Sequence, residues 1–176
     1  QQEVLNRPEI KERAKPAAVV AIILEDLEEE PKLIIIERNQ YVGHHSGQMA
    51  FPGGKMDPAD TDLRETAARE VWEEIGVEID SASLNYVTEH WINVSNYWIT
   101  AFSVRINKKL SYDLNKREIN RIFEIPLAFF KQKESLDYHE LEFMKEKIIA
   151  PRYYYESEEI WGATAVMLYQ LINLID

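Results

Sequence analysis

The chain has 176 residues, of which 45% are apolar and none is cysteine. This length and apolar content predict one folded domain rather than a disordered chain. The lack of cysteine excludes a disulfide scaffold, a thiolate zinc site and a cysteine nucleophile, and fits a cytoplasmic protein. The 20 basic and 31 acidic side chains give a formal net charge of −11. That charge argues against general nucleic-acid binding, because phosphates would be repelled.

Residues 1–16 are polar and charged, without an apolar core. We therefore expect a loose N-terminal arm and no signal peptide, followed by a single domain over residues 17–176. The longest nearly apolar stretch, residues 161–175, is too short to cross a bilayer, so no membrane partner is expected.

The predicted strands are apolar and β-branched runs. In chain order they are 17–24, 32–38, 84–92, 97–106, 118–125 and 148–155, the last with a proline that suits a sheet edge. The predicted helices are 62–75, a short turn at 127–131 and 162–175. Strands outnumber helices and do not alternate regularly with them. The expected fold is therefore an α+β or α/β arrangement, with a mixed sheet flanked by a few helices.

The helix over 62–75 has clear end signals. Asp62 is the expected N-cap, Glu65 completes a capping box, and Gly76 ends the helix. Its expected sheet-facing arc consists of Ala68, Val71, Trp72 and Ile75.

Three glutamates lie near the end of this helix. Glu70 and Glu74 are one turn apart and Glu73 lies beside them. Like charges at this spacing destabilise a helix by about 0.2–0.5 kcal/mol, and acidic groups near a C-terminus oppose the helix dipole. A hard divalent cation such as Mg²⁺ would offset this cost. The alternative is a solvated acidic face, in which Arg69 pairs with Glu65 and Glu73.

The segment Gly54–Val77 resembles the Nudix box, G-x5-E-x7-R-E-U-x-E-E-x-G-U, where U is bulky and aliphatic. Its second half, REVWEEIGV, matches every specified position. Its first half is one residue longer than the pattern, so the first glutamate position falls on Thr61. Asp60 and Asp62 flank Thr61 and could take over its supporting role.

The resemblance implies a Nudix-type mixed sheet between helices, with a loop-helix-loop motif that hydrolyses nucleoside diphosphates linked to another moiety. The implied cofactor is Mg²⁺ or Mn²⁺. Glu70 and Glu74 would be metal ligands and Glu73 a further ligand or catalytic group. Arg69 would orient the glutamates, and the carbonyl of Gly53 or Gly54 would complete the site. A general base often lies outside the box; Glu118 is the candidate, or else only a polar strand end.

A second resemblance lies upstream, in residues 34–38 and 44–54, which are similar to the signature of the coenzyme A pyrophosphatase branch. The extension at 57–60 and the run IWGATA at 160–165 also resemble this branch. Three positions depart from its signature: Ile36, Asn39 and Gly43. The resemblance implies cleavage of coenzyme A (CoA) or its derivatives to 3′,5′-ADP and 4′-phosphopantetheine.

The substrate-binding candidates follow from this signature and from charge. They are Arg38, His44, His45, Gly47, Phe51 and Lys55. Tyr153–Tyr155 could stack an adenine, although strand pairing is the more common role of such a run.

Two further functions stay open. One is an ADP-ribose or dinucleotide pyrophosphatase. The other is a non-catalytic Nudix-fold module that senses a nucleotide, which the intact glutamates disfavour. A homodimer through the C-terminal helix is also possible, although packing of that helix on the sheet is favoured.

Overall fold

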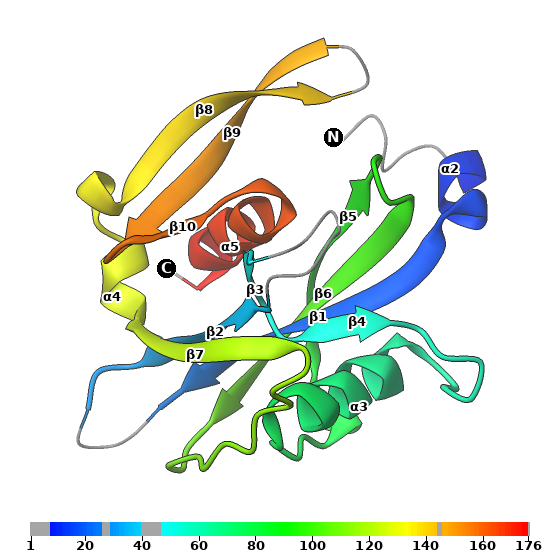
Figure 1. The fold of residues 1–176 in the computed structure, drawn as a ribbon, viewed down its shortest axis with the longest axis vertical. Coiled ribbons are helices and arrows are strands. Elements are labelled where there is room, and N and C mark those ends of the chain that lie inside the picture. The colour runs from blue at the N-terminus through cyan, green and yellow to red at the C-terminus, as the bar shows by residue number, and fades with distance from the viewer. Residues whose placement is uncertain (1–7, 26–28, 40–46, 144–145, 176) are drawn as a thin grey trace.

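The computed structural model describes residues 8–25, 29–39, 47–143 and 146–175. Its main sheet has the strand order β3-β2-β1-β6-β5, with β4 paired to β1 and β7 paired to β2 (Figure 1). These strands are β1 (Lys15–Leu24), β2 (Lys32–Arg38), β3 (Met49–Ala50), β4 (Gly53–Lys55), β5 (Asn85–Ile92), β6 (Tyr97–Ile106) and β7 (Ile119–Pro126). The β1–β6 pair is parallel and the other pairs are antiparallel. The predicted mixed sheet is confirmed.

Helices cover both faces of this sheet. Helix α3 (Leu63–Ile75) lies on one face and α5 (Gly162–Leu174) on the other (Figure 1). Alternate residues of β1 supply the two cores: Ala18, Val20 and Ile22 join the α3 side, while Ala21 and Ile23 join the α5 side. A strand buried on both faces reads as a continuous apolar run, which is why residues 17–24 were recognisable.

The C-terminal helix packs inside the molecule, in agreement with the expectation that it packs on the sheet. Its residues Ala165, Met167, Leu168, Leu171 and Ile172 are buried. Two short helical segments complete this side: α4 (Leu127–Phe130) and the 3₁₀ turn Lys133–Ser135. A further 3₁₀ turn, Ser81–Ser83, follows α3. No helix in the described part of the chain is long and apolar enough to cross a membrane.

A second sheet has the order β10-β9-β8 and was only partly predicted. It consists of β8 (Leu136–Phe143), β9 (Glu146–Tyr155) and β10 (Glu158–Ile160). Strand β10 pairs only with Tyr153–Tyr155, so the rest of β9 is paired with β8 alone. Pro151 lies in that part of β9, which has a paired strand on one side only, and proline is tolerated at such an edge. The β8–β9 hairpin extends above α5 in Figure 1.

The expectation of a loose N-terminal arm is wrong for residues 8–16. Residues Pro8–Arg13 form helix α2, and β1 begins at Lys15. Ile10 packs against a cluster of two buried tryptophans, Trp91 and Trp98. Residues 1–7 lie outside the described part of the chain.

The ends of α3 agree with the prediction, with one shift. The Asp62 carboxylate accepts hydrogen bonds from the backbone N–H groups of Arg64 and Glu65, at 2.8 and 2.9 Å. The Glu65 carboxylate accepts from Thr61 N–H rather than from Asp62, so the capping box is displaced by one residue. Gly76 adopts the left-handed conformation, with φ of 71°.

The expected sheet-facing arc of α3 is wrong at two positions. Trp72 is 57% exposed and Ala68 is only partly buried, while Ala67, Val71 and Ile75 are fully buried. Residues four apart share one stripe of a helix, and Trp72 is about 100° away from Val71 around the axis. The narrow stripe 67-71-75 is therefore sufficient to cover the sheet.

Candidate active site

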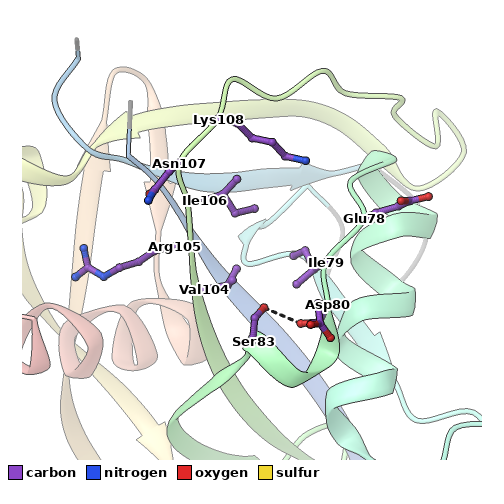
Figure 2. Close-up of a pocket in the computed structure, with 9 residues that line it drawn as sticks. All are labelled: Glu78, Ile79, Asp80, Ser83, Val104, Arg105, Ile106, Asn107 and Lys108. Atoms are coloured by element: carbon purple, nitrogen blue, oxygen red, sulfur yellow. Dashed lines mark hydrogen bonds between the residues drawn. The ribbon is translucent and has the colours of Figure 1, made fainter. Parts of the chain in front are cut away.

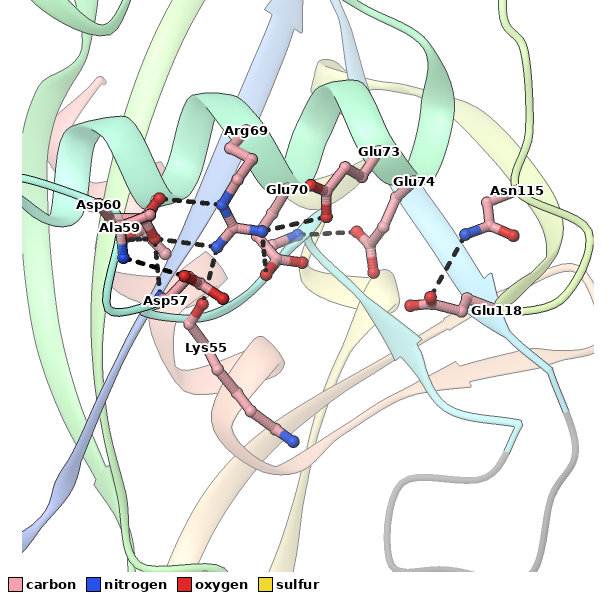
Figure 3. Close-up of polar contacts among 12 residues, drawn as sticks. Lys55, Asp57, Ala59, Asp60, Arg69, Glu70, Glu73, Glu74, Asn115 and Glu118 are labelled. Atoms are coloured by element: carbon pink, nitrogen blue, oxygen red, sulfur yellow. Dashed lines mark hydrogen bonds and ion pairs between the residues drawn. The ribbon is translucent and has the colours of Figure 1, made fainter.

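Two glycines bring the backbone against the α3 glutamates. Gly53 has φ of 146°, and its N–H donates to Glu74 Oε2 at 2.9 Å. A Cβ on Gly53 would overlap the backbone of β1. A Cβ on Gly54 would overlap the carboxylate of Glu70. Only glycine at both positions lets the turn approach the two carboxylates this closely (Figure 3).

Arg69 lies between two neighbouring glutamates. Its Nη1 donates to Glu70 Oε1 at 2.9 Å and to Glu73 Oε2 at 3.0 Å (Figure 3). Its Nη2 donates to the carbonyl of Lys55 at 3.0 Å. The guanidinium therefore connects the Gly turn to the acidic end of α3. The alternative pair with Glu65 is not formed, because Glu65 caps the helix start.

Asp60 anchors Arg69 from the opposite side. Its two oxygens accept from Arg69 Nε and Nη2 at 3.0 and 2.9 Å. It also accepts from the Thr66 hydroxyl at 2.8 Å. The Arg69 guanidinium holds the pKa of Asp60 below its ordinary value. Of the two acids that flank Thr61, Asp60 therefore supports Arg69, while Asp62 caps the helix.

Glu74 is the most deeply buried of the three glutamates, at 1% exposure. Besides Gly53, its partner is Arg38, whose Nη1 donates to Oε1 at 2.9 Å. Burial raises the pKa of Glu74 to about 7, against the opposing effects of Arg38 and the Gly53 N–H. Burial also raises the pKa of Glu70, and Arg69 opposes that shift. Both carboxylates are thus in surroundings where additional positive charge would stabilise the ionised form.

Glu118 lies immediately before β7 rather than at its start. Its Oε2 is 4.0 Å from Arg38 Nη2, and its Oε1 accepts from Asn115 Nδ2 at 3.3 Å. The backbone N–H of Asn115 donates to the Glu74 carbonyl at 2.9 Å. This loop is therefore attached to the C-terminal end of α3, where Figure 3 shows Asn115 and Glu118 near Glu74. It brings Glu118 to the same arginine as Glu74.

A cavity of about 570 Å³ opens beside the Gly turn. Its walls come from β1 to β6, the β8–β9 hairpin and the start of α5. The predicted residues that line it are Arg38, Phe51, Gly53, Gly54 and Lys55. Apolar side chains dominate the rest of the wall, among them Val94, Leu141, Ile148, Trp161 and Met167.

The other expected substrate contacts that the structure describes do not line this cavity. Gly47 is described and lies outside the cavity wall. His44 and His45 fall outside the described residues. Tyr153 is buried in the core, and Tyr154 pairs with Glu159 in β10. The tyrosine run therefore has the strand role, not the adenine-stacking role.

A smaller pocket of about 280 Å³ lies away from these residues (Figure 2). It is formed by the segment after α3 and the end of β6, with Asp80, Arg105 and Lys108 among its side chains. It contains none of the predicted site residues.

The α3 carboxylates fit a hard divalent cation by their chemistry, because such ions prefer oxygen ligands. The space beside Glu70 exists because Gly54 has no side chain. Within the described ranges, no group of three or more histidines, aspartates and glutamates is arranged to hold a metal ion. In this arrangement Arg69 and Arg38 are each bonded to carboxylate oxygens that an ion would need.

The sequence matches the family model of the NUDIX domain over residues 14–147. The chain is 30% identical to the Nudix hydrolase NudL of Yersinia enterocolitica over 149 residues, which cover 84% of this chain and 75% of that protein. It is 34% identical to NudL of Yersinia pestis, covering 83% of this chain and 73% of that protein.

Solved structures share the fold at low sequence identity. A MutT/nudix family protein of Enterococcus faecalis has a TM-score of 0.60 at 13% identity, covering 91% of this chain and 60% of that one. The NUDIX domain of Shewanella oneidensis NrtR, complexed with ADP ribose, has a TM-score of 0.55 at 13% identity. That match covers 72% of this chain and 82% of the other.

The chain belongs to the Nudix hydrolase family. It is a pyrophosphohydrolase of that family, whose members act on small nucleotide substrates and generally use divalent metals. The cytoplasmic location and the homodimer stay predictions.

Proposed function

We propose that this enzyme hydrolyses the diphosphate of CoA or a CoA derivative to 3′,5′-ADP and 4′-phosphopantetheine, with Mg²⁺ or Mn²⁺ as cofactor. The observation that carries the proposal is the position of the α3 carboxylates. Glu74 accepts from the Gly53 N–H and Glu70 lies against Gly54, and both glycines line a cavity of about 570 Å³ whose remaining wall is mainly apolar. Such a cavity fits a diphosphate that carries a long, weakly polar arm, and the upstream CoA-branch signature supplies Arg38 and Phe51 to its wall.

In this proposal Glu70, Glu73 and Glu74 hold the cation, with a carbonyl of Gly53 or Gly54 completing the set. The cation would neutralise the diphosphate oxygens and lower the pKa of the attacking water. Arg69, held by Asp60, orients Glu70 and Glu73. The Gly53 N–H fixes one oxygen of Glu74.

Three residues of the chain would act on the substrate directly. Arg38 and Lys55 line the cavity beside the Gly turn and would pair with the phosphates. Glu118 is half exposed and lies 4.0 Å from Arg38, so it is placed to accept a proton from water that approaches the diphosphate. Because Arg38 also bonds to Glu74, its position depends on the charge at the carboxylates.

The test is mass-spectrometric product analysis after incubation with CoA, with Mg²⁺ and separately with Mn²⁺. We expect 4′-phosphopantetheine and 3′,5′-ADP in equal amounts. ADP-ribose is the comparison substrate, because the Shewanella oneidensis NUDIX domain of similar fold is complexed with ADP ribose. Cleavage of ADP-ribose alone would replace CoA with the second candidate substrate. Cleavage of neither, with intact nucleotide binding, would favour the sensing module.

A further inference from the structure

Four residues on adjacent strands form a row across the floor of the cavity. Lys55 pairs with Ala17, Ala17 with Ile99, and Ile99 with His90. All four line the cavity. Neighbouring strands are about 4.8 Å apart, so the backbones of Lys55 and His90 are separated by about 14 Å. The row therefore runs from the Gly turn, where the phosphates would lie, to strand β5.

His90 is a polar residue in a wall that is mainly apolar. Its ring nitrogen Nδ1 is buried and has no hydrogen-bond partner. A buried polar atom of this kind costs about 1–3 kcal/mol, so each one in a native protein needs an explanation. A ligand that occupies the cavity would supply the missing partner.

The surroundings of His90 fit a neutral, planar ligand group. Burial lowers the pKa of His90 to about 4, so its ring is neutral near pH 7, with one nitrogen donating and the other accepting. A neutral imidazole is suited to a nucleobase edge rather than to a phosphate. Tyr97 lines the cavity on the same face of the sheet as His90 and offers aromatic surface. The small side chain of Ala17 leaves space in the row for a sugar.

We propose that His90 is a specificity-determining residue that hydrogen-bonds the base of a nucleoside diphosphate whose phosphates lie at the Gly53–Gly54 turn. The inference rests on the proposed function only in placing the diphosphate at that turn. It assigns the β5 side of the cavity to the nucleoside, and so assigns the wall formed by β8 and β9 to the other half of the substrate.

The experiment compares the binding of ADP and of inorganic pyrophosphate by titration calorimetry in the presence of Mg²⁺. Chromatography of the recovered ADP checks that it has not been hydrolysed. His90→Phe removes the hydrogen bond and keeps an aromatic ring, and His90→Gln keeps a donor and an acceptor. We expect His90→Phe to weaken ADP binding about tenfold and to leave pyrophosphate binding unchanged. The ADP affinity of His90→Gln should stay within about threefold of that of the wild type.

His139→Phe is the matched control. Its Nδ1 is also buried without a partner, but the residue lies in β8 outside the cavity wall. ADP affinity should be unchanged in this variant. Equal ADP affinity in wild type and His90→Phe, or no ADP binding by the wild type, would overturn the inference.

A measurement on the wild type covers the case in which His90→Phe does not fold. The imidazole ¹⁵N resonances of His90 should shift when ADP is added and stay in place with pyrophosphate. No shift with ADP overturns the inference. Because these measurements need no turnover, normal ADP binding without CoA hydrolysis would count against the proposed function alone.

Discussion

The Gly turn, which is packed against α3, and the β8–β9 hairpin both line one cavity, and they are built differently. On the α3 side, the functional carboxylates are held by backbone N–H groups and arginines, and Glu74 is almost fully buried. On the hairpin side, apolar side chains such as Ile148 are partly exposed, and most of β9 is paired with β8 alone. The proposed chemistry therefore lies on a constrained scaffold, while the proposed recognition wall is apolar and lightly supported.

The largest effect should come from Glu74→Gln, which removes a charge and keeps the Gly53 hydrogen bond. We expect turnover to fall about 10³-fold, because a lost metal ligand removes several kcal/mol of charge stabilisation. Glu78→Gln, just beyond α3 and in the pocket of Figure 2, is the control and should keep full activity. For both variants, steady-state kinetics measures turnover and thermal unfolding checks that the fold is kept. Full activity of Glu74→Gln with Mg²⁺ would remove Glu74 from the metal site.

A smaller loss should follow Gly54→Ala. The added Cβ would overlap the Glu70 carboxylate and displace it, so turnover and Mn²⁺ affinity should both fall about 10²-fold. Gly162→Ala is the contrast: it has φ of 62° and open space around a Cβ. It should cost about 1 kcal/mol of stability through strain and leave Mn²⁺ affinity unchanged. Electron paramagnetic resonance of Mn²⁺ reads out affinity directly; equal affinities in both variants would contradict the steric argument.

Asp60→Asn tests the support of Arg69, with an expected loss of about tenfold in turnover. It should also lower the free energy of unfolding by about 2 kcal/mol near neutral pH. The folded-state pKa of Asp60 is below the ordinary 3.8. The ion pair therefore stabilises the fold above pH 3.8, and this contribution is lost as pH falls through the lowered pKa.

Denaturant unfolding at several pH values measures this difference between wild type and Asp60→Asn. The difference in unfolding free energy between wild type and Asp60→Asn should be constant above about pH 5 and should become smaller in acid. A difference that grows in acid would show that Asp60 does not carry the charge assigned to it. Asp57→Asn serves as a control, because the Asp57 side chain contacts the Ala59 N–H rather than Arg69.

The smallest effect should come from the hairpin. Ile148→Ser removes apolar surface from the cavity wall and should raise KM for CoA about threefold, with kcat unchanged. Ile149→Ser, at a neighbouring position that is 69% exposed and outside the cavity wall, should change neither constant. A fall in kcat for Ile148→Ser would mean that the two walls are coupled more closely than their contacts indicate.

Local signals were sufficient for most of the main sheet and for α3. Strand β2 was predicted with its observed bounds, and the Asp62 and Gly76 ends of α3 were predicted because caps depend on adjacent residues. Strand β8 was missed because LDYHELEF mixes charged and apolar residues without a one-sided pattern. A strand whose partner is its own hairpin neighbour needs no buried face along its whole length.

The sequence by itself determined the family motif, the three glutamates with their spacing, and the Gly turn, because a helix and a tight turn fix neighbours three or four residues apart. Only the tertiary structure decided that Asp60 rather than Asp62 supports Arg69, that Glu74 and Glu118 meet at Arg38, and that His90 lines the cavity. These contacts join residues from different strands, helices and loops. Strand order and register, which long-range packing sets, determine where they meet.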